Sequence, residues 1–332
     1  MSGASPTDGF AEADPRRDRI AGAYGLRYEE VPAPRTEHHR TEPLLVHQVT
    51  PHALPIALEN DQPDPSRSAA SAAMPSKLGA SRLEGQLTPG YHVVADNGAL
   101  DIGALIGTSD ILGGVASGLA VMPAWVVTTN LVVRIDRTSI AGPLHATATV
   151  LHTAERTAVA RVQFTAGDEA TRATSVAEAL VTSAVRRAEG LDLGFGRPLR
   201  HDLWAPPPVE PVPDWFALSQ IGPTTTRLDL LPHLRNPWGI LHGGAMSVLV
   251  DRAARHAATS GRPHRTVGGA PGLPSSRSVM VQFLAPVGVG PVEARCQVLG
   301  AGATGTVIRI EVHDIGADDL VVALATVVVA PS

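Results

Sequence analysis

The sequence predicts an α+β fold made of two copies of one unit, because a segment of its C-terminal half repeats one in its N-terminal half. Gly142 begins GPLHATATVLHTAERTAVARVQF, which aligns without gaps on GPVEARCQVLGAGATGTVIRIEV, beginning at Gly290, at an offset of 148 residues. Both segments have the apolar pattern of antiparallel strands. Upstream, DIGALIGTSD from Asp101 aligns on HGGAMSVLVD from His242 at an offset of 141 residues, and the apolar residues predict a helix. Each unit therefore combines an entering strand, one central helix and several antiparallel strands.

The first 80 residues differ from the rest in composition. Pro, Ser, Ala and His are scattered through residues 1–80, which predicts a largely irregular segment. Within it, the stretch RIAGAYGLRYEEV could add a strand or a helix to the first unit. Four histidines follow at spacings of 1, 8 and 5 residues, which fit no zinc template, and no cysteine accompanies them. We therefore predict no metal site from His38, His39, His47 and His52.

Composition also indicates the boundaries of the two units. We place the first unit at residues 81–186 and the second at residues 214–332. Residues 187–213 are too rich in Pro and Gly for a core element, so they predict a linker that crosses the surface. The seven-residue difference between the two offsets indicates a loop insertion in TSGRPHRTVGGAPGLPSS of the second unit. Near the C-terminus, the eleven residues LVVALATVVVA are too few to span a bilayer as a helix and predict a final buried strand.

The overall composition excludes several classes of partner. The net charge is −5, Lys77 is the only lysine and the scattered arginines form no basic patch, so neither nucleic acid nor a membrane is an expected partner. Cys296 is the only cysteine, which excludes an internal disulfide and fits a reducing compartment. The polar N-terminal residues lack the apolar core of a signal peptide. We therefore expect a cytoplasmic protein.

The stretch NPWGILHGGAMSVLVD, residues 236–251, has the features of a helix start that binds a carbonyl oxygen. Gly243 and Gly244 follow His242, and without a Cβ they let the backbone approach a ligand closely. The apolar residues after them predict a buried helix that begins at these glycines. The first N–H groups of a helix lack intrahelical partners and lie at the positive end of its dipole, so they suit an oxygen that develops negative charge. Asp251, a carboxylate in an otherwise apolar helix, is a candidate acid or base.

In these residues the sequence resembles the PaaI-like acyl-CoA thioesterases of the hotdog fold. That family has an Asn, then HGG, then an Asp nine residues after the His, and here Asn236 lies six residues before His242 and Asp251 nine after it. The family also has a Ser or Thr on the strand after the helix, and Ser276 matches it. The resemblance covers about residues 215–329. Together with the repeat, it implies a tandem hotdog: two antiparallel sheets, each wrapped on a central helix, that form an internal pseudo-dimer.

Helix geometry indicates that the two ends of this motif serve different sites. Gly243 and Asp251 are eight residues apart, which is about 12 Å along a helix and too far for both to contact one thioester carbon. The oxyanion loop must therefore meet an Asp from the other unit, as the resemblance to dimeric hotdog enzymes also implies. The repeat places Asp110 at the position of Asp251, and Thr128 at that of Ser276.

We therefore predict one composite site, in which Asn236, His242 and Gly243 face Asp110 and Thr128 of the first unit. The usual interpretation of the motif, in which Asp251 is the catalytic acid, remains the alternative.

The opposite arrangement, with Asp251 and Ser276 facing the first unit, meets a degenerate loop. Asp101 stands at the position of the motif's His, Ile102 at that of its first glycine, and Ala95 at that of its Asn. The helix of the first unit also contains several glycines, each of which costs up to about 1 kcal/mol of helix propensity relative to Ala. Close packing of the two central helices would accommodate Gly103, Gly107, Gly113, Gly114 and Gly118.

The resemblance implies an acyl-CoA thioesterase, which hydrolyses an acyl-CoA to the free acid and CoA without a metal or organic cofactor. The sequence leaves open whether the Asp is a general base or a nucleophile, and which acyl group is cleaved. The tandem unit could assemble further into a homo-oligomer. The degenerate first loop suggests an alternative, a non-catalytic acyl-CoA-binding or regulatory protein. A hotdog enoyl-CoA hydratase is less favoured, because its Asp and His are five residues apart, and in this helix Asp251 and His256 would point about 140° apart.

Overall fold

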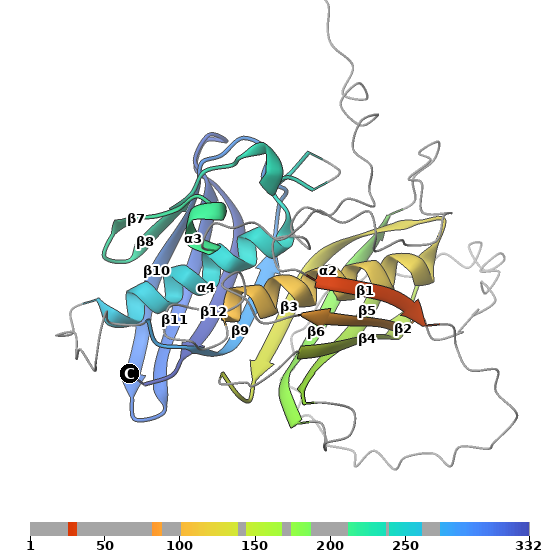
Figure 1. Ribbon diagram of the computed structural model, residues 1–332. Coiled ribbons are helices and arrows are strands. Elements are labelled where there is room, and N and C mark those ends of the chain that lie inside the picture. Colours follow the sequence, from red (N-terminus) through yellow and green to blue (C-terminus); the bar gives the residue numbers. More distant parts are fainter. Residues whose placement is uncertain are drawn as a thin grey trace, which may run out of the picture.

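The computed structural model describes residues 26–31, 82–87, 101–138, 144–167, 174–186, 212–236, 239–260 and 273–331. In these residues the chain forms one twelve-stranded sheet and two long helices (Figure 1). The segment predicted to be irregular, residues 1–80, lies outside the described residues except for one strand. The predicted linker, residues 187–213, lies outside them except for its last two residues, and Ala95 also lies outside them.

The first unit contributes six strands and one long helix to the described part of the chain. Its first strand falls within the RIAGAYGLRYEEV stretch and pairs antiparallel with the second, so that stretch does add a strand. In chain order the elements are β1 (Leu26–Val31), β2 (Arg82–Leu87), α2 (Ile102–Val121), β3 (Trp125–Ile135), β4 (Leu144–Thr153), β5 (Thr157–Ala166) and β6 (Thr174–Arg186).

The second unit repeats this arrangement, with an additional short helix at its start. The predicted final strand is confirmed, since LVVALATVVV forms a strand whose alternate residues are buried. In chain order the elements are α3 (Val212–Trp215), β7 (Leu218–Gly222), β8 (Thr225–Leu228), the 3₁₀ turn η3 (Pro232–Leu234), α4 (Gly243–Thr259), β9 (Ser276–Phe283), β10 (Val292–Gly302), β11 (Gly305–Asp314) and β12 (Leu320–Val329).

The two units share a single sheet rather than having one each. The strand order is β1-β2-β4-β5-β6-β3-β9-β12-β11-β10-β8-β7, and β3 pairs antiparallel with β9 at the junction. Val132 lies opposite Met280, and these residues are 148 positions apart, so a pseudo-twofold axis passes between them. Pairing β3 with β9 satisfies backbone groups that would otherwise form two exposed sheet edges. The predicted internal pseudo-dimer is therefore joined edge to edge.

Each half of the sheet packs on one of the long helices, and the helices pack on each other. α2 contacts β2 to β6, α4 contacts β8 to β12, and the two helices contact each other (Figure 1). By length and apolar composition α2 could span a membrane, but 67% of its apolar window is buried inside the protein. The apolar residues of α2 therefore belong to the hydrophobic core of the protein.

The glycines of α2 differ in what surrounds them. A Cβ on Gly244 would lie 3.3 Å from the backbone of Gly107, so these two positions bring the helices close together, as predicted. Gly113 is different, because a Cβ there would collide with Val181 of the sheet. A Cβ on Gly114 would meet nothing within 4 Å. Helix packing therefore explains only some of these glycines.

Candidate active site

The N-terminus of α4 is built around His242. The helix begins at Gly243, as predicted, and Nδ1 of His242 accepts a hydrogen bond of 2.9 Å from the N–H of Gly244. Because Nδ1 is the acceptor, a neutral ring carries its proton on Nε2. The Gly244 N–H is thus already hydrogen-bonded within the protein. The Gly243 N–H donates to no acceptor among the described residues, which leaves it as the candidate oxyanion donor.

A tight loop before α4 holds this helix start in place. The Asn236 backbone N–H donates to the Ile240 carbonyl at 2.8 Å, and its Oδ1 accepts from the Ile240 N–H at 3.3 Å. Gly239 has φ +76°, a conformation that favours glycine. The His242 N–H then donates to the carbonyl of Leu234. Asn236 therefore shapes the loop.

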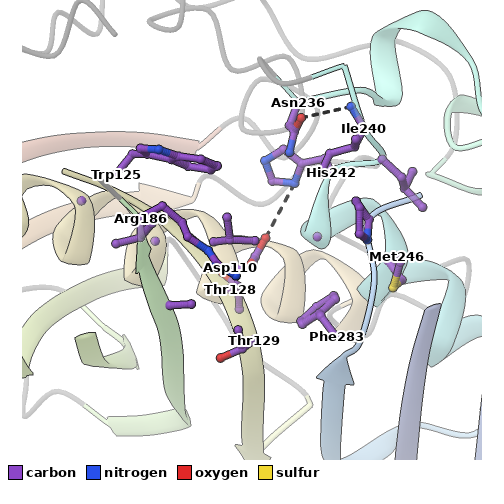
Figure 2. A pocket seen from close by; sticks show the side chains of 18 of the residues that line it. Asp110, Trp125, Thr128, Thr129, Arg186, Asn236, Ile240, His242, Met246 and Phe283 are labelled. Carbon is purple, nitrogen blue, oxygen red and sulfur yellow. Dashed lines mark hydrogen bonds and ion pairs between the residues drawn. The ribbon is translucent and has the colours of Figure 1, made fainter. Parts of the chain in front are cut away.

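A cavity of about 580 Å³ lies where this loop meets the first unit (Figure 2). Its volume is in the range of small-molecule sites. Five of the predicted site residues line it, and they come from both units: Asp110, Thr128, Asn236, His242 and Gly243. Most of its other lining residues are apolar, among them Ile111, Val115, Leu119, Val126, Val127, Met246, Phe283 and Val287.

Asp110 reaches the start of α4 from the other helix. Asp110 is only 7% exposed, and its Oδ2 lies 3.7 Å from Nδ1 of His242 (dashed line in Figure 2). A Cβ on Gly243 would lie 2.6 Å from the same Oδ2. No side chain therefore fits at position 243 unless the carboxylate moves. The geometry that helix spacing predicted, with the glycine of one unit against the aspartate of the other, is present.

Thr128 lines the cavity from the start of β3. The ladder between β3 and β6 shifts register between Thr128 and Asn130. Such a bulge redirects the side chains around it. The hydroxyl-bearing residue predicted from the repeat therefore lies in the same cavity as Asp110, at an irregular point of the strand.

The other predicted site residues lie away from this cavity. Gly244, Asp251 and Ser276 are not among its lining residues. Asp251 is 1% exposed, and its Oδ1 accepts a hydrogen bond of 2.6 Å from the Ser276 hydroxyl. Its Oδ2 lies 3.4 Å from Nη1 of Arg255, which is 3.9 Å from Oδ2 of Asp101.

The opposite arrangement, in which Asp251 faces the first unit near Asp101, forms the second composite position. Arg255 occupies it. Its guanidinium also donates to the backbone carbonyls of Leu273 and Pro274, so it is held at several points. Burial raises the pKa of the Asp251 carboxyl, although the Arg255 guanidinium opposes this shift. Asp101 caps α2, because its side chain accepts the N–H of Ala104. The second position is thus a buried ion network.

No hydrogen bond or ion pair joins Asp251 to His256 in the described part of the chain, so the hydratase pair is not assembled. Within the same part of the chain, no group of three or more His, Cys, Asp or Glu is placed to hold a metal ion.

Comparison with known proteins gives the fold a name. Residues 232–330 match the family described as the acyl-CoA thioesterase N-terminal domain. The 12:0-ACP thioesterase from Umbellularia californica is similar over 76% of this chain and 94% of its own, with a TM-score of 0.50 and 10% identity. The chain has a double-hotdog fold.

Two further solved structures are similar to it. A protein with a hot dog fold from Alicyclobacillus acidocaldarius has a TM-score of 0.47 and 16% identity over 75% of this chain and 92% of its own. A conserved protein from Pseudomonas aeruginosa has a TM-score of 0.29 and 24% identity over 32% of this chain and 81% of its own. No curated protein sequence matches the chain.

Most residues that line the cavity were not predicted as site residues, and three of these bear on its function. Trp125 and Arg186 line it from opposite positions on β3 and β6, and Gly114 lines it from α2. No motif marks these residues. The alignment of the two repeats contained one usable indication, because at an offset of 141 residues Gly114 stands at the position of Arg255.

Proposed function

We propose that this double hotdog is a hydrolase of acyl thioesters, with acyl-CoA as its substrate class. The observation that carries the proposal is the meeting of Asp110 with the Gly243 end of α4 in one cavity. A thioester carbonyl needs a hydrogen-bond donor for its oxygen and a base or nucleophile on the other side of its carbon. This arrangement offers both.

In the proposed reaction, the Gly243 N–H donates to the thioester carbonyl oxygen. The dipole of α4 adds to this stabilisation as negative charge develops on that oxygen. Asp110 either takes a proton from a water molecule that attacks the carbon or attacks the carbon itself, forming an anhydride that water then hydrolyses. In both cases the C–S bond breaks, and the products are a carboxylic acid and a thiol.

The other lining residues have supporting roles in this proposal. His242 fixes the Gly244 amide through Nδ1, which orients the neighbouring Gly243 amide. Asn236 holds the loop in front of the helix through Ile240. Thr128 offers a hydroxyl to the water or the substrate. The apolar wall of the cavity favours an apolar acyl group, because burial of its carbon chain is favourable.

The comparisons support the reaction class but differ in the thiol carrier. The family matched by residues 232–330 is named for acyl-CoA thioesterases, whereas the structure from Umbellularia californica is a 12:0-ACP thioesterase. We retain acyl-CoA as the proposed substrate.

Release of free thiol from a panel of acyl-CoAs tests the proposal. Saturated, branched and aromatic acyl-CoAs should be cleaved at different rates, and crotonyl-CoA, assayed for loss of its double bond, should not be hydrated. Hydration without thiol release would favour the hydratase. Binding of acyl-CoAs without either reaction would favour the non-catalytic alternative.

A single turnover in water labelled with oxygen-18 then tests for a covalent role of Asp110. Label in the Asp110 carboxyl group, with unlabelled oxygen in the acid, would identify Asp110 as a nucleophile whose anhydride is hydrolysed at the aspartyl carbonyl. Label in the acid alone fits a general base, or an anhydride hydrolysed at the acyl carbonyl.

A further inference from the structure

The cavity of the proposed active site contains one cationic side chain that the proposed reaction does not use. Among the described residues that line it, Arg186 is the only Arg or Lys. Arg186 is exposed, so its guanidinium is accessible from solvent. No hydrogen bond or ion pair involves its side chain in the described part of the chain. A guanidinium beside an apolar cavity is well suited to bind an anion.

The sheet fixes where this cation stands relative to the reacting groups. Arg186 ends β6 directly opposite Trp125, the first residue of β3. Thr128 lies three residues along β3, or about 10 Å at the rise of an extended strand. Figure 2 shows the Arg186 side chain extending from the Trp125 end of the cavity toward Thr128 and Asp110. An anionic group held by Arg186 would thus be separated from the thioester carbonyl by a short spacer.

The one acidic group among the described lining residues of the cavity lies at the start of α4. Asp110 is the only acidic residue that lines it in the described part of the chain, and Asp110 lies against His242 and Gly243. No ion pair joins Arg186 to Asp110 there. The Arg186 guanidinium therefore has no counter-ion from the described residues, although it lines a site proposed for a substrate with acidic groups.

We propose that Arg186 is the anion-recognition residue of this site and selects thioester substrates by a negatively charged group. The proposal rests on the proposed thioesterase function. A thioester offers such a group in two places: the phosphates of its carrier, or a carboxylate at the far end of a dicarboxylic acyl group. Both present oxygens to the guanidinium in the same way, so the chemistry recognised is the same.

A factorial substrate set distinguishes the two sources. Butyryl, succinyl, hexanoyl and adipoyl groups are each assayed on CoA, which carries phosphates, and on N-acetylcysteamine, which does not. The variant is Arg186→Gln, with Arg186→Lys to restore the charge and Arg134→Gln as a matched control. Arg134 is an exposed arginine on β3 that does not line the cavity.

We expect Arg186→Gln to raise KM by on the order of tenfold for the substrates that carry the recognised anion, with little change in kcat. A rise confined to CoA substrates identifies the carrier phosphates, and one confined to succinyl and adipoyl substrates identifies the acyl carboxylate. Arg186→Lys should recover part of the loss, and Arg134→Gln should leave KM unchanged.

Two results would overturn the proposal: an unchanged KM for all eight substrates, or an equal fall in kcat for all eight, which would mean that Arg186 acts on the chemical step. If the unsubstituted protein cleaves none of them, the thioesterase function fails. The same thioesters then serve as ligands in calorimetry, and the tenfold weakening is sought in Kd.

Discussion

The two composite positions of this double hotdog have the same framework and opposite contents. At one, Asp110 of α2 lies against the start of α4 in an open cavity. At the other, Asp251 of α4 lies near Asp101 at the start of α2, and the space between them is closed by Arg255. Pseudo-twofold symmetry therefore extends to the positions of the aspartates, but not to the volume beside them.

Two exchanges of side chains account for this difference. At the repeat offset of 141 residues, Arg255 corresponds to Gly114, where a Cβ would meet open space, and Gly243 corresponds to Ile102. The guanidinium of Arg255 occupies one position, whereas at the other Gly114 leaves room for a ligand. An aspartate at the motif spacing is thus insufficient to define a site. The residue one helical turn after the aspartate also differs: Gly114 lines the cavity, whereas Arg255 lies near both Asp251 and Asp101.

A large effect on activity should come from giving position 243 a side chain, as position 102 has. A Cβ on Gly243 would lie 2.6 Å from Asp110 Oδ2, so Gly243→Ala must displace the carboxylate or the oxyanion donor. We expect kcat/KM to fall on the order of 10²-fold, with folding retained by circular dichroism. Gly300→Ala, where a Cβ meets nothing within 4 Å, is the control. Equal activities of the two variants would count against a reactive centre at Gly243.

Removing the guanidinium that fills the second position should mainly affect stability. Arg255→Met leaves two buried carboxylates, Asp251 and Asp101, without their cationic partner, so the free energy of unfolding should fall by about 3–5 kcal/mol. Urea denaturation measures this change. Arg309→Met removes an exposed ion pair with Glu311 and should cost less than about 1 kcal/mol. Similar losses in both variants would contradict the structural role of the network.

A smaller effect should appear in the pH dependence of stability, because His256 follows Arg255 in α4 and is partly buried. Burial, with repulsion from Arg252 and Arg255, lowers the pKa of His256 from 6.5 to about 4. Between these values the unfolded chain binds a proton that the folded protein does not, so the stabilisation present above pH 6.5 is lost as the pH falls toward 4. His256→Gln should flatten this part of the curve. Parallel curves for both proteins would show that His256 contributes nothing to it.

The mildest change should follow from partly filling the open side. Gly114→Leu places a side chain at a position that lines the cavity and where a Cβ would meet nothing within 4 Å, so we expect the protein to fold normally. We expect kcat/KM to fall by roughly tenfold for long or bulky acyl groups and to change little for short ones, because a few methylenes change the discrimination by about this factor. Gly114→Ala is the matched control. A uniform loss across all chain lengths would mean that Gly114 does not line the acyl subsite.

The two composite positions also show which features could be predicted from the sequence. The start of α4 at Gly243 and the placement of Asp110 against it follow from local rules, because helix capping, helix rise and the repeat offset need no knowledge of packing. The pairing of β3 with β9 into one sheet is a tertiary result that no strand pattern specifies.

Three other differences between the prediction and the structure also arise from contacts that no sequence pattern specifies. The role of Arg255 was not predicted from the sequence, because its partners at Asp101 and Pro274 come from distant segments. The Gly244 amide, predicted as an oxyanion donor, is instead bound by the side chain two residues before it. Arg186 belongs to no motif and reaches the cavity only because β6 pairs with β3.

The central claim is that the working carboxylate is Asp110 of the first unit, although Asp251 completes the sequence motif. Comparing kcat for Asp110→Asn and Asp251→Asn, each checked for folding, tests it most directly. We predict that Asp110→Asn lowers kcat on the order of 10²-fold or more, while Asp251→Asn, which alters only the buried network with Ser276 and Arg255, retains most of the activity in its folded fraction. An inactive, folded Asp251→Asn beside an active Asp110→Asn would contradict the account.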